Sequence, residues 1–310
     1  MKEEFDVLLA APRGFCAGVE RAIETVKLSL AKFGKPVYVL HEIVHNKHVL
    51  LELETLGAVF VENLSDIPSG KVCIFSAHGV SVGVEKNAKK LGLKTVDATC
   101  PLVTSVHRMV EKYHLLDFDI VIIGHHNHPE VEGTAGRLSG GKVHVVANED
   151  EAKSIVVENK RKVAYVTQTT LSKYDIVGII DILKYRFPEI KGPKSNICFA
   201  TQNRQDAVRV MVEKSDILFV VGSKNSSNSN RLKEVAIQHG VEAHLIDDHH
   251  DIDPAWLKGK TEIGITAGAS APERLVQDVI SWMQKHGAKN ISQLEGINEK
   301  IHFKPSILTS

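Results

Sequence analysis

The chain has 310 residues, of which 43% are hydrophobic, and its 38 Lys and Arg residues balance 38 Asp and Glu residues. A formal charge of zero gives no electrostatic basis for binding nucleic acid or an anionic membrane, and no apolar run approaches the roughly 18 residues that span a bilayer. No N-terminal stretch has the pattern of a secretory leader, so we expect a cytoplasmic protein without nucleic-acid or membrane partners.

Short apolar runs rich in Val and Ile alternate with segments whose apolar residues recur at helical spacing. In chain order the runs are "DVLLAAP", "PVYVL", "KVCIFSAHG", "DIVIIGHH", "KVHVV", "KVAYVTQTT", "ILFVVGS", "AHLID" and "EIGITAGAS". Most of them are uninterrupted, which is typical of strands covered on both faces in a parallel sheet. The sequence therefore predicts an α/β fold with mostly parallel sheets.

Helical patterns follow three of these strand regions. One runs from Val19 to Leu30, another opens at Pro101, and a third covers about residues 204 to 214. A cysteine stands between strand and helix in each case, and these are Cys16, Cys100 and Cys198.

The nearly even spacing of the three cysteines predicts three similar α/β lobes. We expect the lobes at residues 17–99, at 100–194, and at 195–285 together with 1–16. Residues 286–310 are expected to form a C-terminal surface extension.

Ligands of α/β proteins bind beyond the carboxyl ends of the strands, where all three cysteines are expected. Their shared context favours a common metal site over three separate buried thiols, and both zinc and iron–sulfur centres accept sulfur ligands. A four-iron cluster held by three cysteines would keep one iron open to a substrate. Cys73 lies inside the run "KVCIFS" and is assigned to the core.

Polar residues gather at other strand ends. They are His41, His45 and His48 in "HEIVHNKH", His78 in "SAHGVS", and His125, His126, His128 and Glu130 in "GHHNHPE". "HEIVH" also matches the zinc-peptidase pattern, which requires both histidines on one face of a helix. We disfavour that interpretation because His41 directly follows a predicted strand.

Two later loops, "GSKNSSNSNRL" and "TAGASAPERL", present hydroxyls and backbone N–H groups before predicted helices. Such loops suit helix caps or an anion such as diphosphate, and together they favour the anion. No nucleotide fingerprint or Walker loop is present. In "VTQTTLS", Thr169 and Thr170 could form a helix N-cap and a turn, or one of them could supply a catalytic hydroxyl.

Together, "GFCAGVERAIE", "HEIVHN", "SAHGVS", "DATCPLV", "HPEVEGTAG", "TQTTLS", "GSKNSSNSNRL" and "TAGASAPE" resemble the 4-hydroxy-3-methylbut-2-enyl diphosphate reductase family, also called LytB. The resemblance runs from about residue 7 to residue 280. It implies three α/β lobes around a central [4Fe-4S] cluster with three cysteine ligands and one open iron site.

The resemblance also implies roles for individual residues. Cys16, Cys100 and Cys198 match the cluster ligands. The residues that match those holding the substrate diphosphate are His45, His78, Ser226, Ser227, Asn228 and Ser270. Those that match the group around the reacting hydroxyl are His128, Glu130, Thr169 and Thr170.

The implied reaction is the last step of the non-mevalonate isoprenoid pathway. Two electrons, supplied by ferredoxin or flavodoxin, and two protons convert the hydroxylated isoprenoid diphosphate into isopentenyl and dimethylallyl diphosphates. Hydroxide is a poor leaving group, so Glu130 is expected to deliver the proton that lets the oxygen leave as water. Thr169 and His128 would position the hydroxyl or relay that proton.

Two alternatives remain open from the residues alone. A redox-neutral hydro-lyase could use the same three-cysteine cluster, but it would turn over without added reductant. An iron–sulfur sensor would need no phosphate-type loops and would show no turnover.

Overall fold

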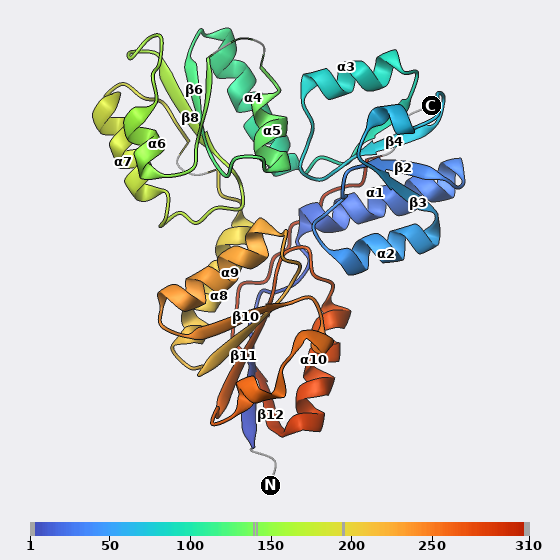
Figure 1. Cartoon of the computed structure of the whole chain (residues 1–310), viewed down its shortest axis with the longest axis vertical. Helices are drawn as coiled ribbons and strands as arrows, with labels where there is room; N and C mark the ends of the chain where they lie inside the picture. The colour runs from blue at the N-terminus through green and yellow to red at the C-terminus, as the bar shows by residue number, and fades with distance from the viewer. Residues whose placement is uncertain (1–3, 139, 141, 194–195, 307–310) are drawn as a thin grey trace. The chain divides into compact units, whose positions relative to one another are not determined.

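The computed structural model describes residues 4–138, 140, 142–193 and 196–306. Helices and strands alternate along most of these residues, and the strands form three parallel sheets (Figure 1). This confirms the predicted α/β fold class. Within the described ranges, no helix is both long and apolar enough to cross a membrane.

The chain divides into two compact units. The first unit contains Met1–Ala17, His45–Leu51 and Phe199–Ile301, and the second contains Gly18–Val44, Glu52–Cys198 and His302–Ser310. The first unit holds one sheet and the second holds two. The lobe boundary predicted between residues 194 and 195 lies outside the described residues, as do residues 1–3 of the predicted third lobe and residues 307–310 of the predicted C-terminal extension.

The sheet of the first unit has the strand order β10-β9-β11-β1-β12, with parallel pairing throughout. Its strands are β1 (Phe5–Leu9), β9 (Ile217–Val221), β10 (Glu242–Ile246), β11 (Glu262–Ala267) and β12 (Ala288–Gln293). The helices of this unit are α8 (Phe199–Val212), α9 (Ser227–Gln238) and α10 (Glu273–His286), with short 3₁₀ turns η2 (His249–Asp251) and η3 (Pro254–Leu257). β9 is buried at every position, as its uninterrupted apolar sequence predicts.

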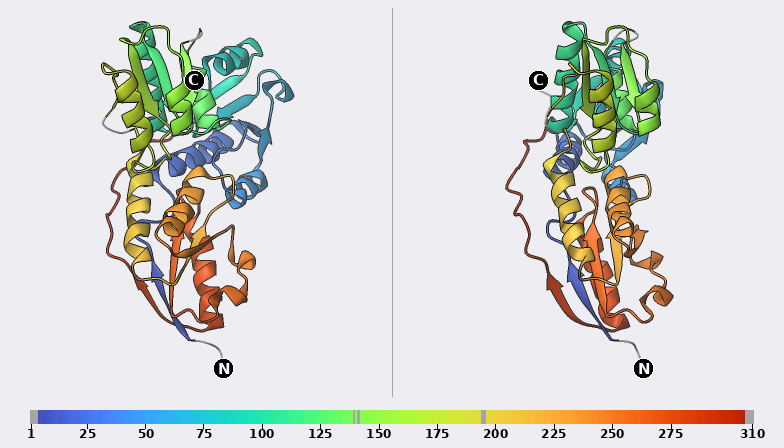
Figure 2. Two further views of the ribbon diagram at one scale, coloured as in Figure 1. Left: turned by 60° about the vertical axis from the view of Figure 1, so that its left-hand side comes forward. Right: turned by 90° about the vertical axis from the view of Figure 1, so that its left-hand side faces the viewer.

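The expected C-terminal extension differs from the structure at its start. Residues 288–293 form β12, which pairs with β1 in the register Val7↔Ile291 (Figure 2). Half-buried Ile291 packs against the core of the unit, and Asn290 donates hydrogen bonds to the Asp6 carboxylate. After β12 the chain continues without helix or strand to residue 306.

The second unit contains a four-stranded sheet in the order β3-β2-β4-β5 and a three-stranded sheet in the order β7-β6-β8. The strands are β2 (Val37–Leu40), β3 (Ala58–Val61), β4 (Val72–Phe75), β5 (Lys94–Asp97), β6 (Asp119–Ile123), β7 (Val143–Val146) and β8 (Val163–Thr167). The helices are α1 (Ala17–Phe33), α2 (Lys47–Leu56), α3 (Val82–Lys90), α4 (Pro101–Leu115), α5 (Pro129–Ala135), α6 (Glu149–Ser154) and α7 (Val177–Arg186), and η1 (Leu64–Asp66) is a 3₁₀ turn. α1 and α2 also contribute residues to the first unit, because Ala17 and the stretch His45–Leu51 belong to it.

Helix starts follow the local sequence signals. α4 begins at Pro101 with Cys100 as its N-cap, and α5 begins at Pro129 with His128 as its N-cap. Proline suits the first helical turn because it lacks the N–H that would be unpaired there. Both starts place a predicted site residue at the cap.

Candidate active site

The three predicted ligand cysteines occupy equivalent turns. Each precedes the first residue of a helix, which is Ala17 of α1, Pro101 of α4 or Phe199 of α8. Each also donates its backbone N–H to a carbonyl oxygen in the loop that follows another strand. The pairs are Cys16 to Ala269 at 3.1 Å, Cys100 to Ala77 at 3.0 Å and Cys198 to Thr169 at 3.1 Å.

The accepting residues share one further property. Each directly precedes a residue predicted to bind substrate, namely Ser270, His78 and Thr170. The same hydrogen bond thus ties each cysteine turn to one loop of the predicted substrate site. Cys16 and its partner lie in the first unit, and the other two pairs lie in the second.

The four cysteines, all within the described ranges, form no disulfide. Cys16, Cys100 and Cys198 are half-buried, whereas Cys73 is 0% exposed. Burial raises the pKa of the Cys73 thiol to about 12, so it stays protonated and is a poor metal ligand. The three half-buried sulfurs fit a thiolate-bound centre, since each precedes a helix N-terminus that stabilises negative charge.

Glu130 is the most perturbed carboxyl group near the predicted chemistry. It lies in the first turn of α5 and is 4% exposed. Its Oε1 accepts a hydrogen bond from the Thr169 backbone N–H at 2.6 Å, and its Oε2 accepts one from the Thr169 hydroxyl at 2.9 Å. Burial raises the pKa of Glu130 to about 7, against the opposing effect of these two bonds. A carboxyl group with this pKa can donate a proton near neutral pH.

Two histidines accompany this pair in the second unit. His128 caps α5, with its Nδ1 accepting the Glu130 backbone N–H at 3.1 Å. The ring of His78 meets the ring of His128 edge to face, with centroids 6.0 Å apart. The structure therefore brings His78, His128, Glu130 and Thr169 together.

The Thr170 hydroxyl has a different environment. It accepts a hydrogen bond from the Gln168 amide at 2.8 Å, and the amide oxygen of Gln168 accepts the His125 backbone N–H at 3.0 Å. Gln168 is 2% exposed and links the two loops. Gln168 was not predicted as a site residue, and its only signal in the sequence is its place in "TQTT".

A second group of predicted residues assembles in the first unit. Ser226 caps α9, and Ser227 is the first residue of that helix. Ser270, which is 7% exposed, donates its hydroxyl to the His45 carbonyl at 2.9 Å. The Asn225 amide lies 3.4 Å from the His45 Nδ1. His45, Ser226, Ser227, Asn228 and Ser270 all belong to this unit.

Asn228 gives the clearest sign of a polar ligand. Its side chain is 4% exposed, and neither Nδ2 nor Oδ1 has a hydrogen-bond partner among the described residues. A buried polar group without a partner costs about 1–3 kcal/mol. It also lies in the first turn of α9, where no acidic side chain opposes an anion.

The remaining histidines of the predicted clusters have structural partners. His41 has a positive φ of 57° and pairs with Glu62, while α2 begins only at Lys47. The two histidines of "HEIVH" therefore do not share a helix face, in agreement with our rejection of the peptidase pattern. His126 pairs with Glu151 on the surface.

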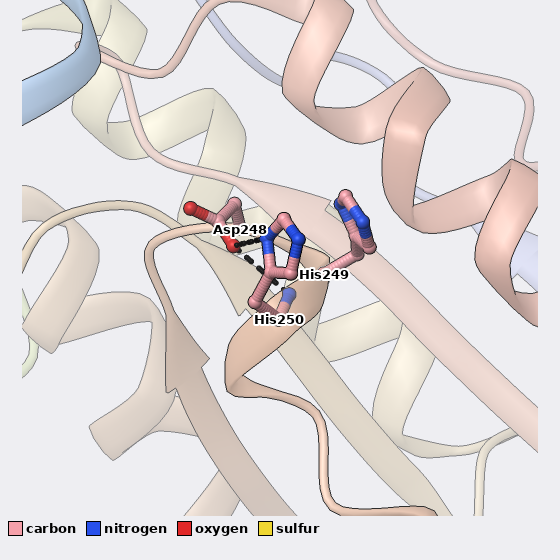
Figure 3. A group of neighbouring side chains, drawn as sticks. All are labelled: Asp248, His249 and His250. Carbon is pink, nitrogen blue, oxygen red and sulfur yellow. Dashed lines mark hydrogen bonds and ion pairs between the residues drawn. The ribbon is translucent and has the colours of Figure 1, made fainter.

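One histidine group was not predicted from the sequence. Asp248, His249 and His250 place potential ligand atoms within 4.8 Å of one another (Figure 3). The Asp248 Oδ1 already accepts bonds from the backbone N–H and Nδ1 of His250, and its Oδ2 lies 2.9 Å from the His48 Nε2. These contacts make Asp248 the cap of η2 and an anchor for the start of α2.

The chain is similar to several known proteins. The family model for LytB protein matches residues 7–284. A 4-hydroxy-3-methylbut-2-enyl diphosphate reductase of Desulfotalea psychrophila (strain LSv54 / DSM 12343) is 60% identical over 306 residues, covering 99% of this chain and 97% of the relative. One of Azoarcus sp. (strain BH72) is 54% identical over 299 residues, 96% of either chain.

Two solved structures are also similar. The E-1-hydroxy-2-methyl-but-2-enyl-4-diphosphate reductase from Plasmodium falciparum matches with a TM-score of 0.90 and 39% identity, covering 96% of this chain and 95% of that one. An (E)-4-hydroxy-3-methyl-but-2-enyl diphosphate reductase, described as the terminal enzyme of the non-mevalonate pathway, matches with a TM-score of 0.65 and 32% identity. It covers 91% of this chain and 99% of that one.

Proposed function

This chain belongs to the LytB family, and on that premise we propose that it reduces 4-hydroxy-3-methylbut-2-enyl diphosphate to isopentenyl and dimethylallyl diphosphates. The reaction is a two-electron dehydroxylation and the last step of the non-mevalonate isoprenoid pathway. The buried Glu130–Thr169 pair is the observation that supports it best, because breaking the C–O bond requires a proton donor.

The family is one of iron–sulfur enzymes, and Cys16, Cys100 and Cys198 are the proposed ligands of a [4Fe-4S] cluster in this chain. When bound, such a cluster supplies single electrons and an open iron that polarises the substrate hydroxyl. The three equivalent cysteine turns support this assignment. Ferredoxin or flavodoxin is the proposed electron donor, and the cytoplasm the proposed compartment.

The ligand assignment can be tested by counting iron. Cys16→Ser, Cys100→Ser and Cys198→Ser should each lower the iron and sulfide content of anaerobically reconstituted protein. Cys73→Ser is the matched control and should keep both, because Cys73 is a buried, protonated thiol. Loss of iron from the Cys73 variant would make it a fourth ligand.

The diphosphate is proposed to bind at His45, His78, Ser226, Ser227, Asn228 and Ser270. The unpartnered amide of Asn228 and the N-terminus of α9 supply donors for phosphate oxygens. Because the product keeps its diphosphate, these contacts hold the substrate without cleaving it. Binding energy far from the reacting carbon then serves to orient that carbon.

Glu130 is the proposed proton donor to the departing oxygen, with Thr169 and His128 beside it. The Thr169 bonds hold the carboxyl group in one orientation. His128 fixes the first turn of α5 through the Glu130 backbone N–H. Thr170, whose hydroxyl is held by Gln168, is proposed to line the same site.

The decisive experiment is turnover of the hydroxylated diphosphate by anaerobically purified, cluster-loaded protein with a strong one-electron reductant. Formation of the two five-carbon diphosphates only when reductant is present would support the reductase. Dehydration without reductant would instead identify a hydro-lyase. A fully loaded cluster without any turnover would favour a sensor.

A further inference from the structure

The guanidinium group of Arg204 is an unusually buried charge. Arg204 lies on α8 and is 1% exposed. A buried arginine remains charged and must have hydrogen-bond partners and a counter-charge. Its contacts therefore show which backbone segments Arg204 holds in place.

Those contacts converge on the turn before Cys16. Nε and Nη2 of Arg204 donate to the Gly14 carbonyl at 3.0 and 2.8 Å, and Nη2 also donates to the Phe15 carbonyl at 3.1 Å. Nη1 donates to the Ala200 carbonyl of its own helix at 2.8 Å. One side chain thus fixes the two peptides that lead into Cys16.

The same helix begins directly after another predicted ligand. α8 starts at Phe199, the residue that follows Cys198. Arg204 therefore joins the helix that follows Cys198 to the turn that presents Cys16.

The counter-charge comes from the segment that follows β12. The side chain of Glu299 is 14% exposed. Its carboxylate accepts hydrogen bonds from Arg204 Nη1 at 3.1 and 3.2 Å and from the Asn203 side-chain amide at 2.9 Å. The segment is held along its length, since the Leu294 N–H donates to the Leu9 carbonyl at 2.9 Å. At Gly296 an added Cβ would lie 2.0 Å from the Ala11 carbonyl oxygen.

We propose that residues 294–299, here called the strap, together with Arg204 form a positioning device for the ligand Cys16, in which Glu299 holds Arg204 and Arg204 holds the Gly14–Phe15 turn. The proposal rests on the assignment of Cys16 as a cluster ligand. The strap does not touch substrate in this scheme, and it acts by keeping the sulfur of Cys16 in place. Without the Glu299 charge the guanidinium loses its ionic partner, and the turn can relax.

The test uses the anaerobically reconstituted full chain and measures iron release to an Fe(II) chelator and the EPR spectrum of the reduced cluster. Glu299→Gln should release iron about tenfold faster, the effect of losing one buried charge-assisted interaction, and should change the EPR line shape. Glu299→Asp keeps the charge and should restore most of the retention. Glu295→Gln, at an exposed site on the strap, is the matched control and should leave both readouts at wild-type values.

Arg204→Lys keeps the charge but lacks the fork that reaches both carbonyls, so it should behave like Glu299→Gln. If it does not fold, as judged by circular dichroism, the Glu299 variants decide alone. Wild-type iron release and an unchanged spectrum in folded Glu299→Gln would overturn the proposal. Cys16→Ser distinguishes failure of the ligand assignment from failure of the strap proposal. If Cys16→Ser retains all its iron, the assignment of Cys16 as a ligand is wrong. If Cys16→Ser loses iron but Glu299→Gln behaves like wild type, only the proposed role of the strap is wrong.

Discussion

At Glu130, burial and hydrogen bonding act in opposite directions on one carboxyl group. Removal from water disfavours the charged form, while the two Thr169 donors favour it. Burial has the larger effect, and the pKa rises to about 7. Near neutral pH the group is therefore present both as the protonated acid and as the carboxylate. This suits a proton donor that must take up a new proton after each turnover.

Replacement of this carboxyl group tests its role. Glu130→Gln keeps the shape and the acceptor oxygen but cannot deliver the proton, so kcat should fall by about 100-fold or more. Iron content and substrate affinity should stay close to wild type. Glu132→Gln, at an exposed site on α5, is the control and should turn over normally. Near-normal turnover of Glu130→Gln would remove Glu130 from the proton path.

The raised pKa also predicts a pH dependence with a definite sign. The protonated form is the donor, so wild-type kcat should decline as pH rises through about 7. The folded state binds this proton more tightly than the unfolded chain, in which the pKa of the Glu130 carboxyl group has its ordinary value of 4.5. Its stabilising contribution is complete below pH 4.5 and is lost as pH rises through about 7. The melting temperature of wild type should fall relative to that of Glu130→Gln as pH rises across this window, and parallel curves would contradict the assignment.

At the scale of elements, the loop after β4 shows how a helix constrains a site residue. Gly79 has a φ of 79°, and an added Cβ would lie 2.6 Å from the Cε1 of His107 on α4. His107 is 6% exposed, and burial, together with the charge of Arg137, lowers its pKa to about 4. The neutral ring is thus packed against the residue that follows His78.

This packing predicts different outcomes for substitution of two glycines that have nearly the same positive φ. Gly70 has a φ of 78° and open space around it. Gly70→Ala should therefore lower the free energy of unfolding only by the strain of the left-handed region, about 1 kcal/mol. Gly79→Ala should cost more, because the methyl group also meets the buried ring. It should also raise KM by displacing His78. Urea unfolding and steady-state kinetics provide both measurements, and equal costs for the two variants would show that the His107 contact is unimportant.

At the scale of the whole molecule, each compact unit has hydrophobic clusters of its own. Ile265 belongs to a cluster of the first unit and Leu183 to one of the second, and both are 0% exposed. Substantial separate cores favour separate unfolding steps. The chain passes between the units several times, but each unit keeps its own sheets.

Calorimetry of the metal-free protein should therefore show two transitions. Ile265→Ala and Leu183→Ala each leave a cavity that costs about 2–5 kcal/mol. Each should lower the melting temperature of a different transition. One transition, lowered equally by both variants, would mean that the units unfold together.

The sequence by itself determined the features that depend on neighbouring residues. Uninterrupted apolar runs identified buried parallel strands such as β9, and proline marked the start of α4. The strand–cysteine–helix turns were visible for the same reason, since periodicity and helix starts are local properties of the chain. The lobe boundaries and the roles of individual site residues stay predictions.

Only the tertiary structure decided what depends on distant residues. The polar sequence "AKNISQ" becomes β12 because β1 offers it a parallel edge. The stretch His45–Leu51 groups with the first unit, and Glu299 pairs with Arg204 across 95 residues of chain. Likewise, the pKa of Glu130 and the unpartnered amide of Asn228 follow from burial. Burial is set by the packing of segments remote in sequence, which no local pattern encodes.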